Sequence, residues 1–275
     1  MSDTPLHRPP RHPYATFVLF GASQVAMIAL WWSVGWEAGL AALLATHLPV
    51  VWATLWPRSR LLSPVLTRLP CSERLVWLTI DDGPGEDTGA MLDLLDAHGA
   101  KATFFVVGRR AATQPRLIRD IVRRGHGLGN HSYHHPSAWF WALPPGRIRA
   151  EITRNQQLLG DLTGTPPRWF RAVVGMANPF VAPVLKSHGL ARVAWSARGF
   201  DAVASDPQQV VARLERDLSP GAIVLLHEGA GHGRSVEILG ALLSRLDALG
   251  YRTVLPEELE SPTTAAVDVT GASAV

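Results

Sequence analysis

The N-terminal part of the chain carries two long stretches without charged side chains. Residues 15–36 contain no Asp, Glu, Lys or Arg, and neither do residues 38–56, with Glu37 between the two stretches. About 20 consecutive apolar residues are enough for a helix to cross the roughly 30 Å hydrocarbon core of a bilayer. The pattern therefore predicts a hairpin of two transmembrane helices. A signal peptide, a single anchor and a buried helical hairpin of a soluble domain are the alternatives.

The charges that flank these stretches indicate an orientation. Arg8 and Arg11 precede the first stretch, and Arg58, Arg60 and Arg68 follow the second, whereas the short connection has no Lys or Arg. Positive residues beside transmembrane helices favour the cytoplasmic side. Five of the ten tryptophans lie before residue 60, which is typical of a membrane interface. We therefore expect both ends of the hairpin, and the domain that follows it, on the cytoplasmic side of a membrane.

The remaining chain alternates short apolar runs with amphipathic stretches. Strands are expected at residues 75–80, 102–107, 127–130, 168–173, 191–196, 222–226 and 252–254. Helices are expected at residues 86–98, 115–124, 145–162, 207–218 and 235–249. This alternation predicts a parallel sheet or a barrel in a domain that spans residues 74–258. We expect residues 57–73 to form a linker, and residues 1–14 and 259–275 to be disordered.

Composition excludes several classes of protein. The net charge is only +3, and no basic stripe with interleaved aromatic residues is present, so we expect no nucleic-acid partner. The single cysteine, Cys71, excludes a disulfide framework and argues against a cysteine-based zinc site.

Side chains that can carry chemistry fall at the ends of the predicted strands. In chain order they are Asp81, Asp82, His131, His135, Arg171, Asp201 and His227. Each has an ordinary explanation by itself, because Asp-Asp-Gly-Pro forms a good turn and histidines often simply pack at strand ends. In barrels, however, active sites collect at the C-terminal ends of the strands. Their joint placement therefore predicts one site.

The spacing of two histidines points to a metal. His131 and His135 are four residues apart, so in a helical turn their rings lie on one face. Two neutral imidazoles and one carboxylate make a three-ligand site that leaves room for water and substrate. If Asp81 or Asp82 binds the cation, its neighbour stays ionised despite the crowding. These residues alone do not say which aspartate has which role.

Three segments resemble motifs of a known family. LTIDDGP (residues 78–84), HSYHHP (131–136) and IVLLHE (223–228) are similar to the first, second and fifth motifs of the polysaccharide deacetylases, the NodB-homology or carbohydrate esterase family 4 enzymes. The resemblance covers residues 75–256. It implies an α/β fold, a distorted (β/α) barrel of about seven strands, and one divalent metal ion, most often zinc. It also implies a hydrolase that removes N-acetyl groups from an N-acetylated carbohydrate.

The resemblance also implies a role for each residue of the site. Asp82 would bind the metal together with His131 and His135, while His134, which lies between them, would not. Asp81 would be the general base. The general acid that protonates the leaving nitrogen would be His227.

Further residues would support these. Arg171 would orient the base, and Asp201 would raise the pKa of His227. A backbone N–H near Tyr133 would stabilise the oxyanion, and Arg198 would meet an anionic group on the substrate.

The chain departs from the family in two places. The third motif, usually Arg-Pro-Pro-x-Gly, reads Arg-Ala-Val-Val-Gly at residues 171–175, and Ala202 stands where a pocket tryptophan is expected. These departures put the substrate in doubt, and a formyl in place of an acetyl group is one option. They also support an alternative, a catalytically silent glycan- or lipid-binding protein.

The membrane prediction bears on the substrate as well. With the domain on the cytoplasmic side of a bacterial inner membrane, a lipid-linked sugar is expected as substrate, and membrane lipid as a partner. With the domain on the outer side, a glycan polymer is expected instead.

Overall fold

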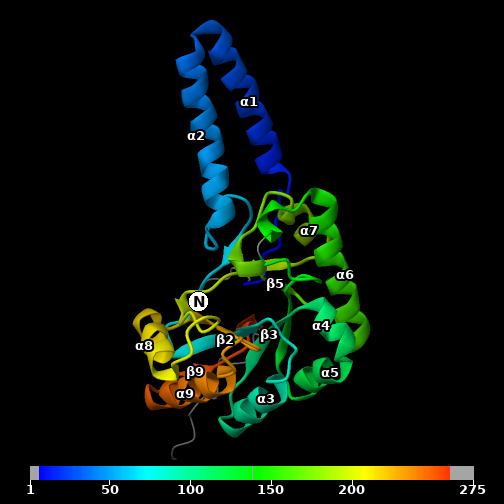
Figure 1. Ribbon diagram of the computed structural model, residues 1–275, viewed down its shortest axis with the longest axis vertical. Coiled ribbons are helices and arrows are strands. Elements are labelled where there is room, and N and C mark those ends of the chain that lie inside the picture. Colours follow the sequence, from blue (N-terminus) through cyan, green and yellow to red (C-terminus); the bar gives the residue numbers. More distant parts are fainter. Residues whose placement is uncertain (1–5, 138, 261–275) are drawn as a thin grey trace, which may run out of the picture.

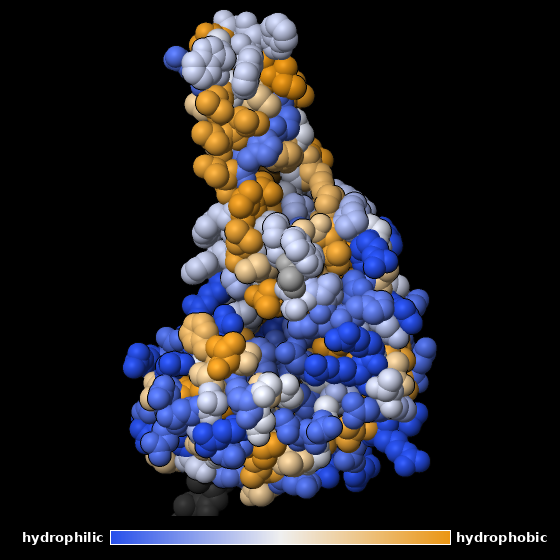
Figure 2. Space-filling view, viewed as in Figure 1, coloured by the Kyte–Doolittle hydropathy of each residue, from blue (hydrophilic) through white to orange (hydrophobic). Residues whose placement is uncertain are grey.

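The computed structural model describes residues 6–137 and 139–260. Its most prominent feature is a hairpin of two helices, α1 (Ala15–Ser33) and α2 (Trp36–Leu55), which projects from a rounded domain (Figure 1). Both helices are long and apolar enough to span a membrane, and no residue of α1 is buried. Figure 2 shows their largely apolar surface. The two predicted spans are therefore helices, and by length and composition they are candidate membrane spans.

A parallel sheet forms the centre of the domain. The described residues contain β1 (Val65–Leu66), β2 (Leu75–Asp81), β3 (Ala102–Val106), β4 (Gly127–Asn130), β5 (Trp169–Phe170), β6 (Ala191–Val193), β7 (Ala197–Arg198), β8 (Ala222–His227) and β9 (Arg252–Thr253). Their order is β1-β6-β5-β4-β3-β2-β8-β7, with β9 also paired to β2, and every strand pair is parallel. The predicted α/β barrel-like fold is confirmed.

One segment of chain runs from β6, next to one edge strand of this sheet, to β7 at the other edge. Residues 191–196 were predicted as a single strand, but β6 ends at Val193 and β7 begins at Ala197. β6 pairs with β5, whereas β7, which lies just beyond the predicted strand, pairs with β8. Residues 191–198 therefore bridge the two sides of the barrel. The predicted strand therefore contains only β6, and the sequence pattern did not predict β7.

Helices surround the sheet (Figure 1). They are α3 (Thr88–Ala97), α4 (Gly108–Thr113), α5 (Pro115–Arg123), α6 (Pro145–Thr163), α7 (Val181–Ser187), α8 (Pro207–Asp217), α9 (Ser235–Ala248) and α10 (Pro256–Glu260), with 3₁₀ turns η1 (Phe140–Ala142) and η2 (Val173–Gly175). Local signals set their ends. At α8 the Asp206 side chain accepts a hydrogen bond from the N–H of Gln208, and Pro207 occupies the first turn. Gly164, which is left-handed, ends α6.

Alternation along β2 decides which side chains reach the interior of the barrel. Val76, Leu78 and Ile80 belong to the core shared with the helices. Trp77 belongs to a second cluster, and its indole N–H donates to Thr103. Successive side chains of a strand point to opposite faces, so Asp81 shares the face of Trp77. The same alternation that fills the core thus places a carboxylate inside the barrel.

Segments expected to be disordered or to form a linker pack against the domain. Leu6 is buried, and the backbone N–H of His7 donates to Glu260 at 2.9 Å. Val65 and Leu69, in the expected linker, are also buried. The chain is therefore packed on the domain at these residues, because single apolar residues without periodicity fill gaps at the edge of the barrel. Residues 1–5 and 261–275 lie outside the described part of the chain.

Candidate active site

Two carboxylates stand at the C-terminal end of β2. Asp81 is its last residue and is almost fully buried. Asp82 follows with a φ of 74°, a left-handed conformation that turns the chain sharply. The two side chains therefore leave the strand in different directions. Asp82 Oδ1 lies 3.0 Å from His135 Nε2 and 3.5 Å from His131 Nε2.

The two histidines converge, although not through a helix. Residues 131–135 form an irregular loop after β4, in which Ser132 and His135 have positive φ values of 65° and 53°. The expected helical turn was therefore wrong, while the expected convergence is present. The ring centroids of His131 and His135 are 4.9 Å apart. The strained backbone of this loop brings the two rings together, which a helical turn was expected to do.

The three side chains suit a divalent cation. One ligand atom from each of Asp82, His131 and His135 lies within 4.8 Å of the other two. Among the described residues, buried Asp82 Oδ1 finds no hydrogen-bond donor in suitable geometry. The Nδ1–H of His131 donates to the carbonyl of Arg171 at 2.9 Å, which leaves Nε2 directed toward the carboxylates. Such an outer partner is typical of metal-binding histidines.

Electrostatics at this point favour a positive charge. Burial alone would raise the pKa of Asp82, but the adjacent imidazoles of His131 and His135 lower it far below its ordinary value. Burial would likewise lower the pKa of His131, yet the carboxylates of Asp81 and Asp82 raise it. A proton or a cation is thus stabilised between the two aspartates. Two adjacent carboxylates can therefore be tolerated at the end of this apolar strand.

Asp81 itself is held by a buried arginine. Arg171 Nη1 donates to Asp81 Oδ1 at 2.6 Å and to Thr79 at 2.8 Å, and Nη2 donates to the carbonyl of Ala194. The guanidinium also lies 4.1 Å from the ring centre of Phe105. Arg171 is fully buried. It therefore fixes the orientation of the Asp81 carboxylate.

A second charged pair lies at the end of β8. His227 Nδ1–H donates to Asp201 Oδ1 at 3.1 Å, and the backbone N–H of His227 donates to Oδ2 at 2.6 Å. Burial would lower the pKa of His227, but the hydrogen bond and charge of Asp201 raise it. The imidazole therefore keeps its proton to a higher pH than an ordinary histidine.

Comparison with known proteins identifies the family. The polysaccharide deacetylase model matches residues 69–193. A chitooligosaccharide deacetylase from Bradyrhizobium sp. is 37% identical over 57% of this chain and 71% of its own length. The chain belongs to the polysaccharide deacetylase family. It is therefore a hydrolase of carbohydrate esterase family 4.

Two further members of this family are similar. A peptidoglycan-N-acetylglucosamine deacetylase from Bacillus cereus is 31% identical over 71% of this chain and 92% of its own. A solved structure of a carbohydrate esterase family 4 pseudoenzyme from Bacillus anthracis has a TM-score of 0.65 and 28% identity, and the match covers 72% of this chain and 69% of that one. The family fold thus occurs in active and inactive members.

Tyr133 and Arg198, which were expected to serve the oxyanion and the substrate, have partners within the protein, and the role of Arg198 stays a prediction. The backbone N–H of Tyr133 donates to Glu151 at 3.1 Å and is therefore not free for an oxyanion. The Arg198 guanidinium lies 4.6 Å from the ring centre of Phe200 and 5.3 Å from that of Trp195. Burial lowers the pKa of Arg198, although Asp201 and Asp81 partly oppose this. The charges of both carboxylates therefore act on Arg198.

Glu151 is a residue of the site that sequence reasoning missed. It is buried on α6, and it accepts hydrogen bonds from the N–H groups of Tyr133 and His134 and from His134 Nδ1. Glu151 therefore holds the loop that carries His131 and His135 in place. No spacing rule links it to the motif 17 residues earlier.

Glu228 was also missed, although it belongs to the LLHE segment. It is buried, accepts a hydrogen bond from Thr88 at 2.7 Å, and has a pKa that burial raises to about 7.

Backbone strain gives a further signal that the sequence lacked. The described non-glycine residues with positive φ are Asp82, Ser132, His135, Val174 and Phe200. All follow β2, β4, β5 or β7, at the C-terminal ends of the strands. Such strain clusters at functional sites.

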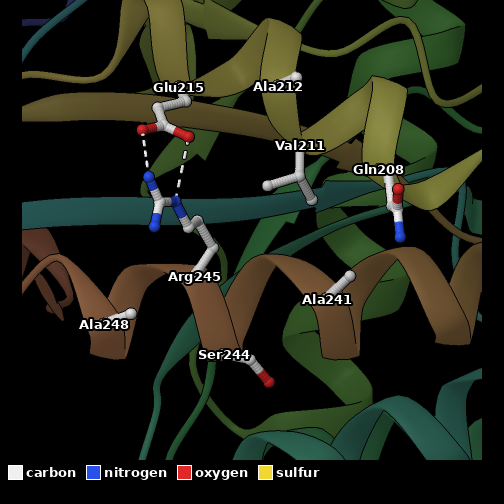
Figure 3. Close-up of a pocket in the computed structure, with 8 residues that line it drawn as sticks. All are labelled: Gln208, Val211, Ala212, Glu215, Ala241, Ser244, Arg245 and Ala248. Atoms are coloured by element: carbon white, nitrogen blue, oxygen red, sulfur yellow. Dashed lines mark hydrogen bonds and ion pairs between the residues drawn. The ribbon is translucent and has the colours of Figure 1, made fainter.

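A surface groove elsewhere does not belong to the site. It lies between α8 and α9 and is lined mainly by small and aliphatic side chains (Figure 3). Arg245 pairs with Glu215 across it, with N–O distances of 2.6 and 3.0 Å. None of the motif residues lines this groove.

Proposed function

We propose that the protein removes N-acetyl groups from an N-acetylated sugar with the help of one divalent metal ion, most often zinc in this family. The observation that carries the proposal is the meeting of Asp82, His131 and His135 beside two charged pairs, Asp81 with Arg171 and Asp201 with His227. The first pair supplies a base and the second supplies an acid. Amide hydrolysis at neutral pH needs both.

The chain's own residues fit each step of this reaction. Asp82, His131 and His135 would hold the metal, which when bound polarises the acetyl carbonyl and acidifies water. Asp81, oriented by Arg171, accepts a proton from the attacking water. His227 donates its proton to the sugar nitrogen as the C–N bond breaks, so that acetate and a free amine result. The raised pKa of His227 keeps that proton available.

We further propose a lipid-linked sugar as substrate, at the cytoplasmic face of a bacterial inner membrane. The apolar helices and the arginines at both ends of the hairpin support this placement. If the domain lies on the outer side, a polymer such as the relatives' chitooligosaccharide or peptidoglycan is the substrate.

A catalytically silent glycan- or lipid-binding protein is the second candidate. The altered segment 171–175 and Ala202 favour it, as does the similarity to a pseudoenzyme. The presence of Asp81 and His227 with their partners favours the enzyme.

Turnover by the purified full-length protein separates these candidates. We would load it with zinc and measure acetate release from a chitooligosaccharide, from peptidoglycan and from a polyprenyl-phosphate-linked N-acetylglucosamine. Formate release from an N-formyl analogue tests the formyl option. Release from the lipid-linked sugar supports the proposal, whereas bound zinc without turnover of any of these would favour the silent binder. A reporter fused after residue 275 shows on which side the domain lies.

A further inference from the structure

The base of the hairpin packs directly on the active-site loops. The carbonyl of Thr54, near the end of α2, accepts a hydrogen bond from the N–H of Ala177 at 3.2 Å. Phe17, near the start of α1, stacks on Phe180 with ring centroids 5.4 Å apart. Ala177 and Phe180 belong to the loop after β5, which also contains Arg171. The candidate membrane spans and the catalytic centre thus share one short loop.

A glycine makes the closest approach possible. Gly175 has a φ of 78°, and an added Cβ would lie 2.7 Å from Pro57 and 2.6 Å from the Trp195 ring. Pro57 comes two residues after α2. The following residue, Arg58, donates to the carbonyl of Ser196 at 3.1 Å, between β6 and β7. The hairpin base is therefore fixed to the loops that follow β5 and β6.

Exposed apolar side chains are concentrated in loops at the same end of the barrel as this base. After Trp56, the described large apolar residues that are exposed are Leu61, Val122, Trp139, Val174, Phe200 and Val203. Four of these six, Trp139, Val174, Phe200 and Val203, lie in loops after β4, β5 and β7, and we call them the apolar rim. Single exposed apolar residues are ordinary. The concentration of these four residues on the loops at one end of the barrel is unusual.

Every rim residue is close in sequence to a residue of the active site. Trp139 follows His135 by four residues, Val174 follows Arg171 by three, and Phe200 immediately precedes Asp201. The turn that follows Trp139 is tied to the loop after β5, because the Asn178 side chain donates to the carbonyls of residues 141 and 143. In Figure 2 the apolar surface of the hairpin reaches the domain, where further apolar patches lie beside a hydrophilic recess.

We propose that the apolar rim docks on the bilayer that holds the hairpin, at the boundary between headgroups and acyl chains, so that the catalytic opening sits on the membrane surface. This rests on the proposed function and its membrane placement. Continuity with the apolar hairpin identifies lipid as the occupant, and aromatic residues such as Trp139 and Phe200 suit this boundary. Exposed Arg60, beside the base, adds attraction to anionic headgroups. The docked site fits an amphiphilic glycan whose lipid tail stays in the membrane.

Site-directed fluorescence tests the docking without relying on activity. In a Cys71→Ser background, Val203→Cys and Trp139→Cys would be labelled with an environment-sensitive dye in the full-length protein. Val122→Cys, on α5, is the matched control, since Val122 is 41% exposed and α5 lies away from the hairpin, whereas Val203 and Trp139 are 82% and 66% exposed. Val25→Cys in α1 reports insertion of the hairpin. The protein is reconstituted in nanodiscs of phosphatidylcholine and phosphatidylglycerol.

We expect dyes at 203 and 139 to shift to the blue and to be quenched by a nitroxide-labelled lipid, as at 25, while the dye at 122 is quenched only by iodide. Equal iodide quenching at 203, 139 and 122, with the dye at 25 in lipid, would overturn the proposal. So would protection at 203 that persists in detergent and grows with protein concentration, which indicates a second copy as occupant.

A kinetic readout links the docking to the substrate. Val203→Ser together with Trp139→Ser should raise KM for a polyprenyl-linked N-acetyl sugar in vesicles several-fold and leave turnover of a soluble chitooligosaccharide unchanged. An equal effect on both substrates would contradict a role in membrane docking. If no N-acetyl sugar is turned over while the dyes remain in lipid, the deacetylase proposal fails and the docking surface stands.

Discussion

The two halves of the active site are built in different ways. The ends of β2 and β4 carry Asp81, Asp82, His131 and His135, which are held by contacts inside the domain and stand in segments that match the family's motifs. The loops after β5 and β7 contain the altered segment 171–175 and Ala202. This second half also touches the hairpin, through Gly175 and Ala177.

The difference separates chemistry from substrate choice. Metal ligation and base catalysis need atoms fixed to within a fraction of an ångström, and buried carboxylates need complete partners. The half that supplies them follows the family pattern. The other half keeps Arg171 and Asp201, which would support the proposed base and acid, and departs from the family motifs within residues 171–175 and at Ala202. We therefore expect substitutions in the first half to abolish the reaction and those in the second to change its substrate or pH range.

The largest effect is expected from removal of the metal ligands. His131→Ala combined with His135→Ala should lose bound metal and reduce deacetylation by at least about 10³-fold, since a metal contributes several kcal/mol to such reactions. Elemental analysis and acetate release would be measured on the same samples. His134→Ala is the matched control, because His134 lies between the ligands and its side chain faces Glu151. Equal loss of metal in His134→Ala would contradict the ligand assignment.

Asp81→Asn should separate metal binding from proton transfer. The variant keeps its metal ligands, so its zinc content should equal that of the wild type. Its kcat should fall by about 10²- to 10⁴-fold, the usual contribution of a general base. If turnover is normal with a full complement of zinc, then Asp81 is not the base. The opposite distribution, lost zinc in Asp81→Asn and full zinc in Asp82→Ala, would exchange the roles of the two aspartates.

Much of the first half was predictable from the sequence, and the reason is local. The apolar run of β2 ends at Asp81, and strand alternation together with the Asp-Asp-Gly-Pro turn fixes where the carboxylates lie. Glu151 was not predictable, because its partners are backbone N–H groups that only the folded loop presents. The ordered segment around Leu6 and the contact of Gly175 with Pro57 depend on packing between distant residues. Sequence periodicity carries no signal for such contacts.

Asp201→Asn tests how Asp201 affects the pKa of His227, the proposed acid. The folded protein holds the pKa of His227 above its ordinary value through Asp201, against the effect of burial. A neutral amide removes that charge, so the pKa of His227 should fall. Because His227 must be protonated to act, activity is lost as pH rises through this pKa. The falling limb of the kcat profile should therefore move to lower pH in Asp201→Asn, and an unmoved limb would mean that another group donates the proton.

The smallest effect is expected at Glu151, which holds the ligand loop from a distance. Glu151→Ala leaves the N–H groups of Tyr133 and His134 without their acceptor and loosens a loop that has positive φ at Ser132 and His135. Metal affinity should fall about tenfold, as is usual for partners behind the ligands. Glu151→Gln keeps a carbonyl oxygen that can accept both bonds and should restore most of the affinity. A zinc titration of both variants checks this pair. If Gln is as weak as Ala, then the negative charge of Glu151, not its hydrogen bonds, supports the site, and the first half depends on electrostatics more than on loop geometry.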